Sequence, residues 1–427
     1  MINFKHPEYV KWAQDWEKDR DGISGEGAVK DKNERYLPKL GGQTPTAYSA
    51  YLRRANYINF SGRTLQAGLG QILRKNPVLD GIDEPERLYY VSKAVLSEMM
   101  TTNRGGILVD YDEIKDTPET IVYRAEDIIN WRYTTQLDFV VLSGSVYVED
   151  PADKYKVKKE IVYKELYLEE GVYKYRLWHK EKEEYVPGDE TVPEMLGQRF
   201  SFIPFFFVTT NGNTPDIDKA PLSDLINLNL SHYRNNADYE NMLHWTGAKT
   251  IVTKGWGDKP FPIGGAPDFP TDGGAEFLEA SSDSGLKDEL THKEEAMAIL
   301  GSSLLSGKSK NVIAAETARI TSSGEYATLA DISNAMSDVM TKVYAVYGAW
   351  QGKNPDEISI TYNTDFETAK LDATTLTAWM TAVMNGQLSQ KQFFWNMQKS
   401  DMYEDGWTFE EEQTEIEAGE PDGIDVL

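Results

Sequence analysis

The sequence contains no cysteine, which excludes disulfide bonds, thiolate metal sites and cysteine nucleophiles together. This absence is compatible with a reducing cytoplasm. No stretch approaches 18 uncharged apolar residues, and the first residues do not combine a charged segment with an apolar run. The sequence therefore indicates neither secretion nor a membrane-spanning helix.

Histidine is scarce, with five residues at His6, His179, His232, His244 and His292. Only His232 and His244 are expected on one helix, where twelve residues turn them about 120° apart. Their side chains do not converge, so we expect polar contacts and no metal or cofactor. No GxSxG turn marks a serine nucleophile either.

Basic residues are in short supply. The chain has 44 Lys and Arg against 69 Asp and Glu, for a net charge of -25. This balance disfavours a protein that grips nucleic acid, because such binding neutralises phosphates with Lys and Arg. It remains compatible with a protein that lets DNA slide past. Residues 400–427 are acidic without one Lys or Arg and are predicted to form a solvated tail.

The composition nevertheless predicts a folded protein. Hydrophobic residues make up 40% of the 427, with 24 Tyr and 10 Trp, so the chain can bury a core and is not wholly disordered. Its length favours two or three compact units. The mean hydropathy of -0.52 suits a thin or extended protomer.

The first half of the sequence predicts an α+β region after a polar arm. Residues 1–43 are rich in turn signals, and we expect an arm with one short helix near 10–16. Thr44 and Pro45 predict a helix start, and the helical pattern continues to residue 76, with a break possible at its glycines. A second helix is predicted over 84–101. Six strand-like runs with turns between them predict an antiparallel sheet: 107–111, 121–123, 139–149, 160–168, 172–178 and 202–208.

The second half predicts long helices around a small β excursion. A helix over 220–245 has a polar, partly wet asparagine side at Asn227, Asn235, Asn236 and Asn241. Short strands at 250–252 and 275–278 flank a run dense in Gly and Pro. The helical pattern returns over 285–305 and 314–350. A strand at 358–362, a helix ending at residues 385–386 and a helix opened by a Ser389–Gln392 capping box complete the pattern.

Residues 301–309, GSSLLSGKS, look like a phosphate-binding P-loop. The loop needs four residues between its glycines, whereas five separate Gly301 from Gly307, and the preceding residues predict a helix where a strand is required. Nucleotide binding through Gly307, Lys308 and Ser309 is therefore the weakest of the alternatives. Lys308, Lys310 and Arg319 form a small basic island in an acidic protein, and an ordinary exposed loop is the simpler interpretation.

Several segments together resemble a branch of the portal proteins of tailed bacteriophages. They are 51–57 (YLRRANY) with 62–65 (GRTL), 125–132 (AEDIINWR), 202–207 (FIPFFF), 211–212 (NG), 220–241 (APLSDLINLNLSHYRNNADYEN), 247–255 (GAKTIVTKG) and 385–389 (NGQLS). Their order and spacing extend the resemblance over most of residues 45–400. Members of this branch are often described only as phage proteins of unknown function.

The resemblance implies a ring, usually of twelve subunits, at the capsid vertex of the virion, assembled in the host cytoplasm. It implies no enzymatic activity and no cofactor. Double-stranded DNA would pass through the ring without sequence specificity during packaging and ejection. The terminase, head-tail connector or adaptor proteins and the major capsid protein would be its partners, with no membrane.

The implied portal-like protomer divides the chain into named regions. They are an N-terminal arm (1–43), an α+β wing (44–219), stem helix 1 (220–245), a clip (246–284), stem helix 2 (285–305), a tunnel loop (306–313), a wing helix and strand (314–365), and a crown with the acidic tail (366–427).

Candidate functional residues follow from these regions. The tunnel loop would meet DNA through Gly307, Lys308, Ser309, Lys310 and Asn311. The clip would dock partners through Lys254, Trp256, Lys259, Phe261 and Phe269. The stem helices would pack through Leu222, Ile226, Tyr233, Leu290, Met297 and Leu300.

Two alternatives remain open beside the portal. Another virion structural protein, such as a connector or minor capsid component, is the first, although the helix, β excursion and returning helix argue against it. The second is a nucleotide-dependent enzyme built on Gly307-Lys308-Ser309.

Overall fold

The computed structural model describes residues 1–427 apart from 86, 113, 151–152, 248–249, 256, 258–268, 279–283, 306–314, 365, 367–372, 400–402, 404–406 and 419–427. The chain divides into two compact units, Met1–Thr364 and Asp365–Leu427. Helices and antiparallel strands both contribute, which confirms the α+β class. No helix in the described ranges is long and apolar enough to cross a membrane.

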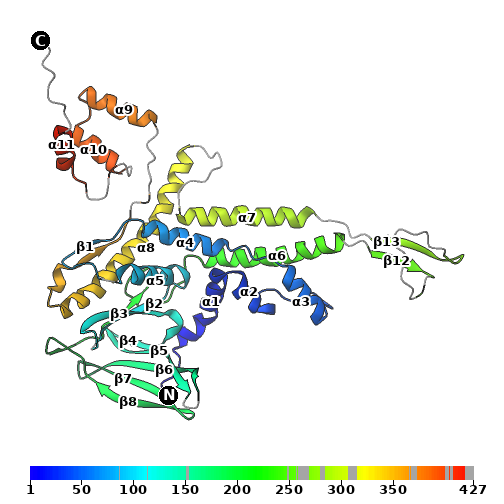
Figure 1. Ribbon diagram of the computed structural model, residues 1–427, viewed down its shortest axis with the longest axis horizontal. Helices are drawn as coiled ribbons and strands as arrows, with labels where there is room; N and C mark the ends of the chain where they lie inside the picture. The colour runs from blue at the N-terminus through cyan, green and yellow to red at the C-terminus, as the bar shows by residue number, and fades with distance from the viewer. Residues whose placement is uncertain are drawn as a thin grey trace. The chain divides into compact units, whose positions relative to one another are not determined.

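The two larger antiparallel sheets of the first unit have five and three strands (Figure 1). One has the order β4-β5-β6-β7-β8, with strands Ile128–Tyr133, Leu137–Asp150, Asp153–Glu169, Val172–Glu181 and Glu184–Thr191. The other has the order β11-β2-β3, with strands Phe205–Val208, Gly105–Asp112 and Thr117–Arg124. Buried side chains such as Val140, Leu142 and Leu166 join the sheets to Trp16 and Phe207 in one core.

Two strands of the larger sheet, β4 and β8, were not predicted. The sequence of β8 contains Pro187 and Gly188, which predict a turn. In the structure β8 is an edge strand, where proline is tolerated because one side of the strand needs no ladder hydrogen bonds. A short hairpin, β9 (Glu194–Met195) with β10 (Gln198–Arg199), follows it.

The helix predicted near residues 10–16 is longer than expected, and a second helix follows it. Residues 1–43 contain helix α1 (Pro7–Ser24) and helix α2 (Glu26–Asp31), where one short helix was predicted. Trp16 is buried in the core, and Arg20 binds the carboxylates of Glu98 and Glu126. These contacts stabilise α1 over 18 residues against the body of the unit.

The single helix predicted from Thr44 is two helices, α3 (Pro45–Arg54) and α4 (Phe60–Ile72). The start at Thr44 is as predicted, since its side chain accepts a hydrogen bond from the Ala47 amide. The break lies at residues 55–59 and not at the glycines, because Asn59 caps α4 by accepting from the Gly62 amide. Helix α5 (Leu88–Thr101) packs against β2 and β3.

The remaining elements of the first unit follow the predicted order. They are α6 (Ser223–Gly247), β12 (Thr250–Lys254), β13 (Gly274–Leu278), α7 (Ser284–Leu305), α8 (Ala315–Trp350) and β14 (Ser359–Thr361). The two short strands β12 and β13 pair antiparallel. Strand β14 pairs with β1 (Val78–Asp80), a pairing that no local pattern indicated.

The second unit contains α9 (Ala373–Met384), α10 (Gln390–Lys399) and α11 (Phe409–Ala418). Ser389 accepts from the Gln392 amide, as the capping box requires of its serine. Part of the acidic tail forms α11, where Glu410, Glu411 and Glu415 are exposed, as expected of a solvated segment. There the Phe409 ring packs 5.7 Å from that of Phe394, and Trp407 donates to Glu412 at 3.0 Å.

Candidate functional site

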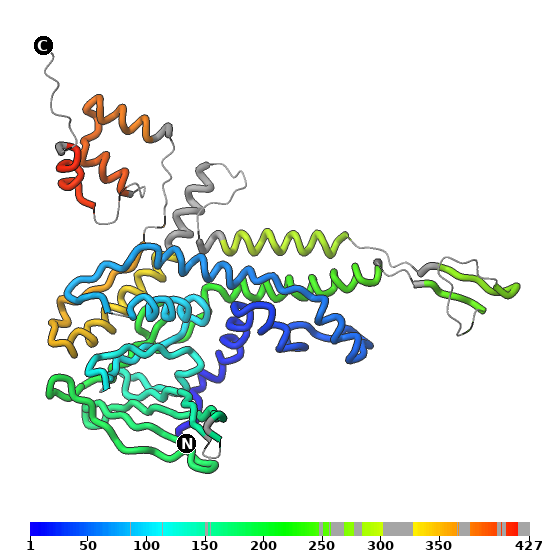
Figure 2. Tube along the Cα trace, in the orientation of Figure 1, coloured from blue at the N-terminus to red at the C-terminus, as the bar shows by residue number. Residues whose placement is uncertain are grey.

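Helices α6 and α7 form an antiparallel pair that carries the β12–β13 hairpin between them in the chain (Figure 1). Helix α4 lies alongside both, as the trace in Figure 2 shows, and helix α8 follows α7. The segments expected as stem, clip and wing helix are thus α6 with α7, the β12–β13 hairpin, and α8, which follow one another in the chain.

The expected stem-packing residues are mostly buried within the single chain. Leu222, Ile226, Tyr233, Leu290 and Met297 are buried, whereas Leu300 is 39% exposed. Leu222 and Ile226 therefore pack within the core of the chain itself. Whether any of the six also contacts a neighbouring subunit remains a prediction.

The polar side of α6 is less wet than predicted. Asn236 accepts a hydrogen bond from the Asn56 amide at 2.8 Å, and Asn241 accepts from Arg54 at 2.8 Å. Buried Asn229 donates to the Ile58 carbonyl at 2.8 Å. These amides hold the segment between α3 and α4, while Asn227 is exposed as expected.

His232 is the buried titratable group between the paired helices. Its Nε2 atom lies 3.2 Å from Glu294 of α7, and its ring packs edge-on against Phe60 of α4. Burial lowers the pKa of His232, although Glu294 acts in the opposite direction. His232 thus contacts both α4 and α7 as a structural side chain. The described residues hold no group of acids or histidines that could bind a metal.

The P-loop interpretation gains no support from Gly301. This residue lies inside α7, where a side chain would meet the Thr64 hydroxyl of α4 at 3.0 Å. A larger side chain at this position would press on α4 and displace Thr64. The loop residues Gly307, Lys308, Ser309, Lys310 and Asn311 lie outside the described residues.

The expected clip surface is described only in part. Lys254 ends strand β12 and pairs in register with Gly274, and Phe269 precedes β13 at intermediate exposure. Trp256, Lys259 and Phe261 lie outside the described residues. A common clip surface thus stays a prediction.

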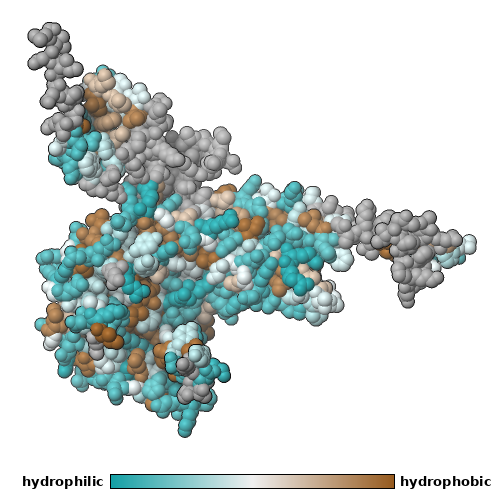
Figure 3. Space-filling model, in the orientation of Figure 1, coloured by the Kyte–Doolittle hydropathy of each residue, from teal (hydrophilic) through white to brown (hydrophobic). Residues whose placement is uncertain are grey.

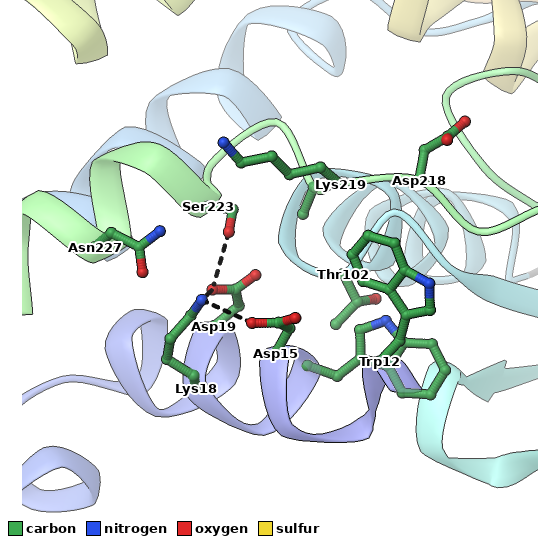
Figure 4. Close-up of a pocket in the computed structure, with 11 residues that line it drawn as sticks. Trp12, Asp15, Lys18, Asp19, Thr102, Asp218, Lys219, Ser223 and Asn227 are labelled. Carbon is green, nitrogen blue, oxygen red and sulfur yellow. Dashed lines mark hydrogen bonds and ion pairs between the residues drawn. The ribbon is translucent and has the colours of Figure 1, made fainter. Parts of the chain in front are cut away.

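Sequence reasoning missed a pocket of about 200 Å³ between α1 and the start of α6 (Figure 4). Trp12, Asp15, Asp19, Lys219 and Ser223 are among the side chains that line it. Asp19 is buried and its pKa is raised to about 6, mainly by loss of water around the carboxylate. The lining residues lie some two hundred positions apart in the chain, so no local signal could have joined them.

A second missed group is Arg104, which is buried between the rings of Trp131 and Phe207 at 4.5 and 4.1 Å. Its guanidinium donates to the Pro215 carbonyl at 2.9 Å. Desolvation lowers the pKa of Arg104 to about 9, while Asp216 raises it. The side chain remains cationic at neutral pH and holds the loop before α6 against the sheets.

Residues 221–351 match a family model described as a domain of unknown function, DUF4055. The match covers α6 through α8, the part that contains the paired helices and the hairpin. No curated protein matches the chain.

Chains of gene transfer agent particles are among the similar solved structures. A chain of the virion of a native gene transfer agent particle is 10% identical, with a TM-score of 0.40, and the match covers 85% of this chain and 96% of that chain. A chain of the neck of the empty particle, computed with C6 symmetry, is 11% identical with a TM-score of 0.38, covering 83% and 93%. These values are too low to assign the fold or a function.

Proposed function

We propose that this chain is a portal protein, the subunit of a ring at the unique vertex of a phage capsid. The observation that carries the proposal is the antiparallel pair α6 and α7 with the β12–β13 hairpin between them. Helix α6 has 25 residues, about 38 Å at 1.5 Å per residue, which is long enough to flank a channel. The α+β part of the first unit then corresponds to the wing, and the second unit to the crown.

The charge of the chain supports a conduit. Twelve subunits at -25 each give a ring of about -300, so DNA meets repulsion along most of the wall. The few lysines of the tunnel loop would contact phosphates without reading sequence. Catalysis is not required, because a terminase motor would supply ATP hydrolysis. The ring would dock terminase and later connector proteins at the clip, and the major capsid protein around it.

Electron microscopy of the purified protein tests the proposal. We expect closed rings with an axial channel, a mass close to twelve subunits and negligible ATP hydrolysis. Monodisperse monomers in salt that permits assembly would contradict the proposed ring. ATP binding that is lost in the Lys308→Ala variant would favour the nucleotide enzyme instead.

Localisation separates the portal from a connector or minor capsid component. We expect the protein in the capsid vertex itself, present in empty capsids before DNA and tail are added. Its appearance only after DNA packaging, below the vertex, would identify a connector.

A further inference from the structure

Strands β5 and β6 extend beyond the rest of their sheet as a two-stranded ribbon, residues 143–150 and 153–162. In the described sheet, β4 pairs with β5 only as far as Leu142, and β7 pairs with β6 only from Tyr163 onward. Neither outer edge of the ribbon therefore forms a ladder with another described strand. A two-stranded ribbon is marginally stable in water by itself, so a further contact would stabilise this extension of the sheet.

The ribbon exposes apolar side chains on both of its faces. Tyr147, Val157 and Ile161 share one face, because Tyr147 pairs with Lys159 while the other two belong to the flanking pairs of the ladder. Val146 and Val148 lie on the opposite face. All five side chains are exposed, Tyr147 by 70%. Exposed apolar groups clustered on one projecting element mark an interaction surface.

The charge of the ribbon's second strand is opposite to that of the chain. Residues 154–159, KYKVKK, contain four lysines and no acid in a protein of net charge -25. A groove of about 460 Å³ at the base of the ribbon is lined by Lys158, Lys159, Lys180 and Lys182 together with Glu160 and Glu183. The matching surface on a partner should therefore be acidic.

The open edge of the same sheet provides such a surface. Residues 181–194, which contain edge strand β8, include six acids and one lysine. Within one copy, the ribbon reaches only the beginning of β8, where Glu183 and Tyr185 line the groove with Lys158. Strand β7 separates the open edge of β8 from β6. A second copy can bring the two together. Pro187 lacks the amide that continuous strand addition needs, so side chains would make the contact.

We propose that the ribbon of one subunit binds the acidic β8 edge of the neighbouring subunit. The inference rests on the proposed ring and names one of its contacts. Two different patches meet in this contact, and such heterologous contacts generate closed rings when the rotation between subunits closes.

Charge reversal tests the contact. Lys156→Glu with Lys158→Glu removes two cations from the ribbon, and Glu184→Lys with Asp189→Lys reverses two acids of the β8 edge. We expect each pair to raise the protein concentration needed for half-maximal assembly by about tenfold, since like charges then meet at the interface. Combining all four substitutions should restore assembly to near the wild-type value. Sedimentation velocity measures assembly, and circular dichroism checks that each variant folds.

A matched control is Lys11→Glu with Lys115→Glu. These lysines resemble those of the ribbon, because each is exposed and each pairs with an acid two or three residues away. The net charge changes equally in both variants, so any difference in assembly depends on where the reversed charges lie. We expect the control to assemble far better than the ribbon variant. Equal assembly of both variants, or no recovery in the fourfold variant, overturns the proposal.

The remaining outcomes separate this contact from the ring itself. Open chains of wild-type protein that show the same loss and recovery would keep the ribbon contact and refute the closed ring. Wild-type monomers at every concentration would overturn both. A ribbon variant that assembles normally but no longer retains duplex DNA would replace the contact by a nucleic-acid surface.

Discussion

The Asp19 carboxyl group lies between α1 and the first turn of α6 and is only 2% exposed. Its neighbours compensate the buried charge poorly, since Lys18 lies 3.6 Å away and Ser223 donates at 3.5 Å. Loss of hydration raises the pKa of Asp19 from 3.8 to about 6. The folded chain therefore holds this proton more tightly than the unfolded chain does, and ionisation of Asp19 opposes folding.

The sign of the effect gives a pH-dependent prediction. Stability contributed by the protonated group is lost as pH rises from about 4 to about 6 and stays absent above that range. Asp19→Asn, which keeps the shape without the charge, should raise the free energy of unfolding by about 1–2 kcal/mol near neutral pH. Urea unfolding at both ends of the range measures this, and the gain should vanish at about pH 4. The control Asp15→Asn alters an exposed neighbour, and an equal gain there would contradict the burial argument.

At the scale of elements, two glycines in neighbouring helices have opposite roles. A side chain at Gly301 of α7 would meet Thr64 of α4 at 3.0 Å, whereas a side chain at Gly70 of α4 would meet open space. The first glycine permits close packing of two helices. The second only weakens its helix.

Substitutions at these glycines should therefore diverge. Gly301→Leu should lower the free energy of unfolding by about 2 kcal/mol or more, because overpacking forces α4 and α7 apart. Gly70→Ala should raise it by about 0.5–1 kcal/mol through helix propensity. Chemical denaturation of the two variants and of Gly70→Leu measures the difference. Similar losses at both positions would show that helix packing is not the cause.

Elements with a long apolar period could be predicted from the sequence, and those made by distant contacts could not. The apolar patterns of α6, α7 and α8 extend over many turns, so the predicted ends of these helices lie within a few residues of the observed ones. The break at residues 55–59 depends on Asn229 and Asn236 of α6, which bond the backbone there. Strand β1 exists through its pairing with β14, almost 300 residues away.

The candidate site also has features that local sequence predicts and features that depend on distant residues. The β12–β13 pairing followed from short apolar runs around a Gly and Pro-rich segment. The burial of Asp19 and Arg104 depends on partners from distant parts of the chain, such as Ser223 and Phe207, and no local pattern carries that information.

At the scale of the whole molecule, the tunnel-loop lysines give a test of function separate from assembly. Lys308→Ala with Lys310→Ala, or deletion of residues 307–311, should leave ring formation unchanged, because the proposed loop touches DNA and not the neighbouring subunit. DNA packaged per capsid, measured by protection from nuclease, should fall. Lys11→Ala with Lys115→Ala is the control with equal charge loss, because both lysines are exposed and lie outside the α6–α7 pair. Loss of rings in the loop variants would assign the loop to the subunit interface instead.

The pairing of β1 with β14 closes the first unit across most of its length, in register from Val78–Thr361 to Asp80–Ser359. Two side-chain contacts reinforce the same closure. The Tyr362 hydroxyl is hydrogen-bonded to Ser92, and Lys353 donates to Asp83. During translation, strand β1 leaves the ribosome hundreds of residues before its partner, and contacts of such sequence separation form slowly. The unit can therefore be completed only after residue 361 has been synthesised. A truncated chain that lacks β14 therefore lacks the strand that completes its own first unit.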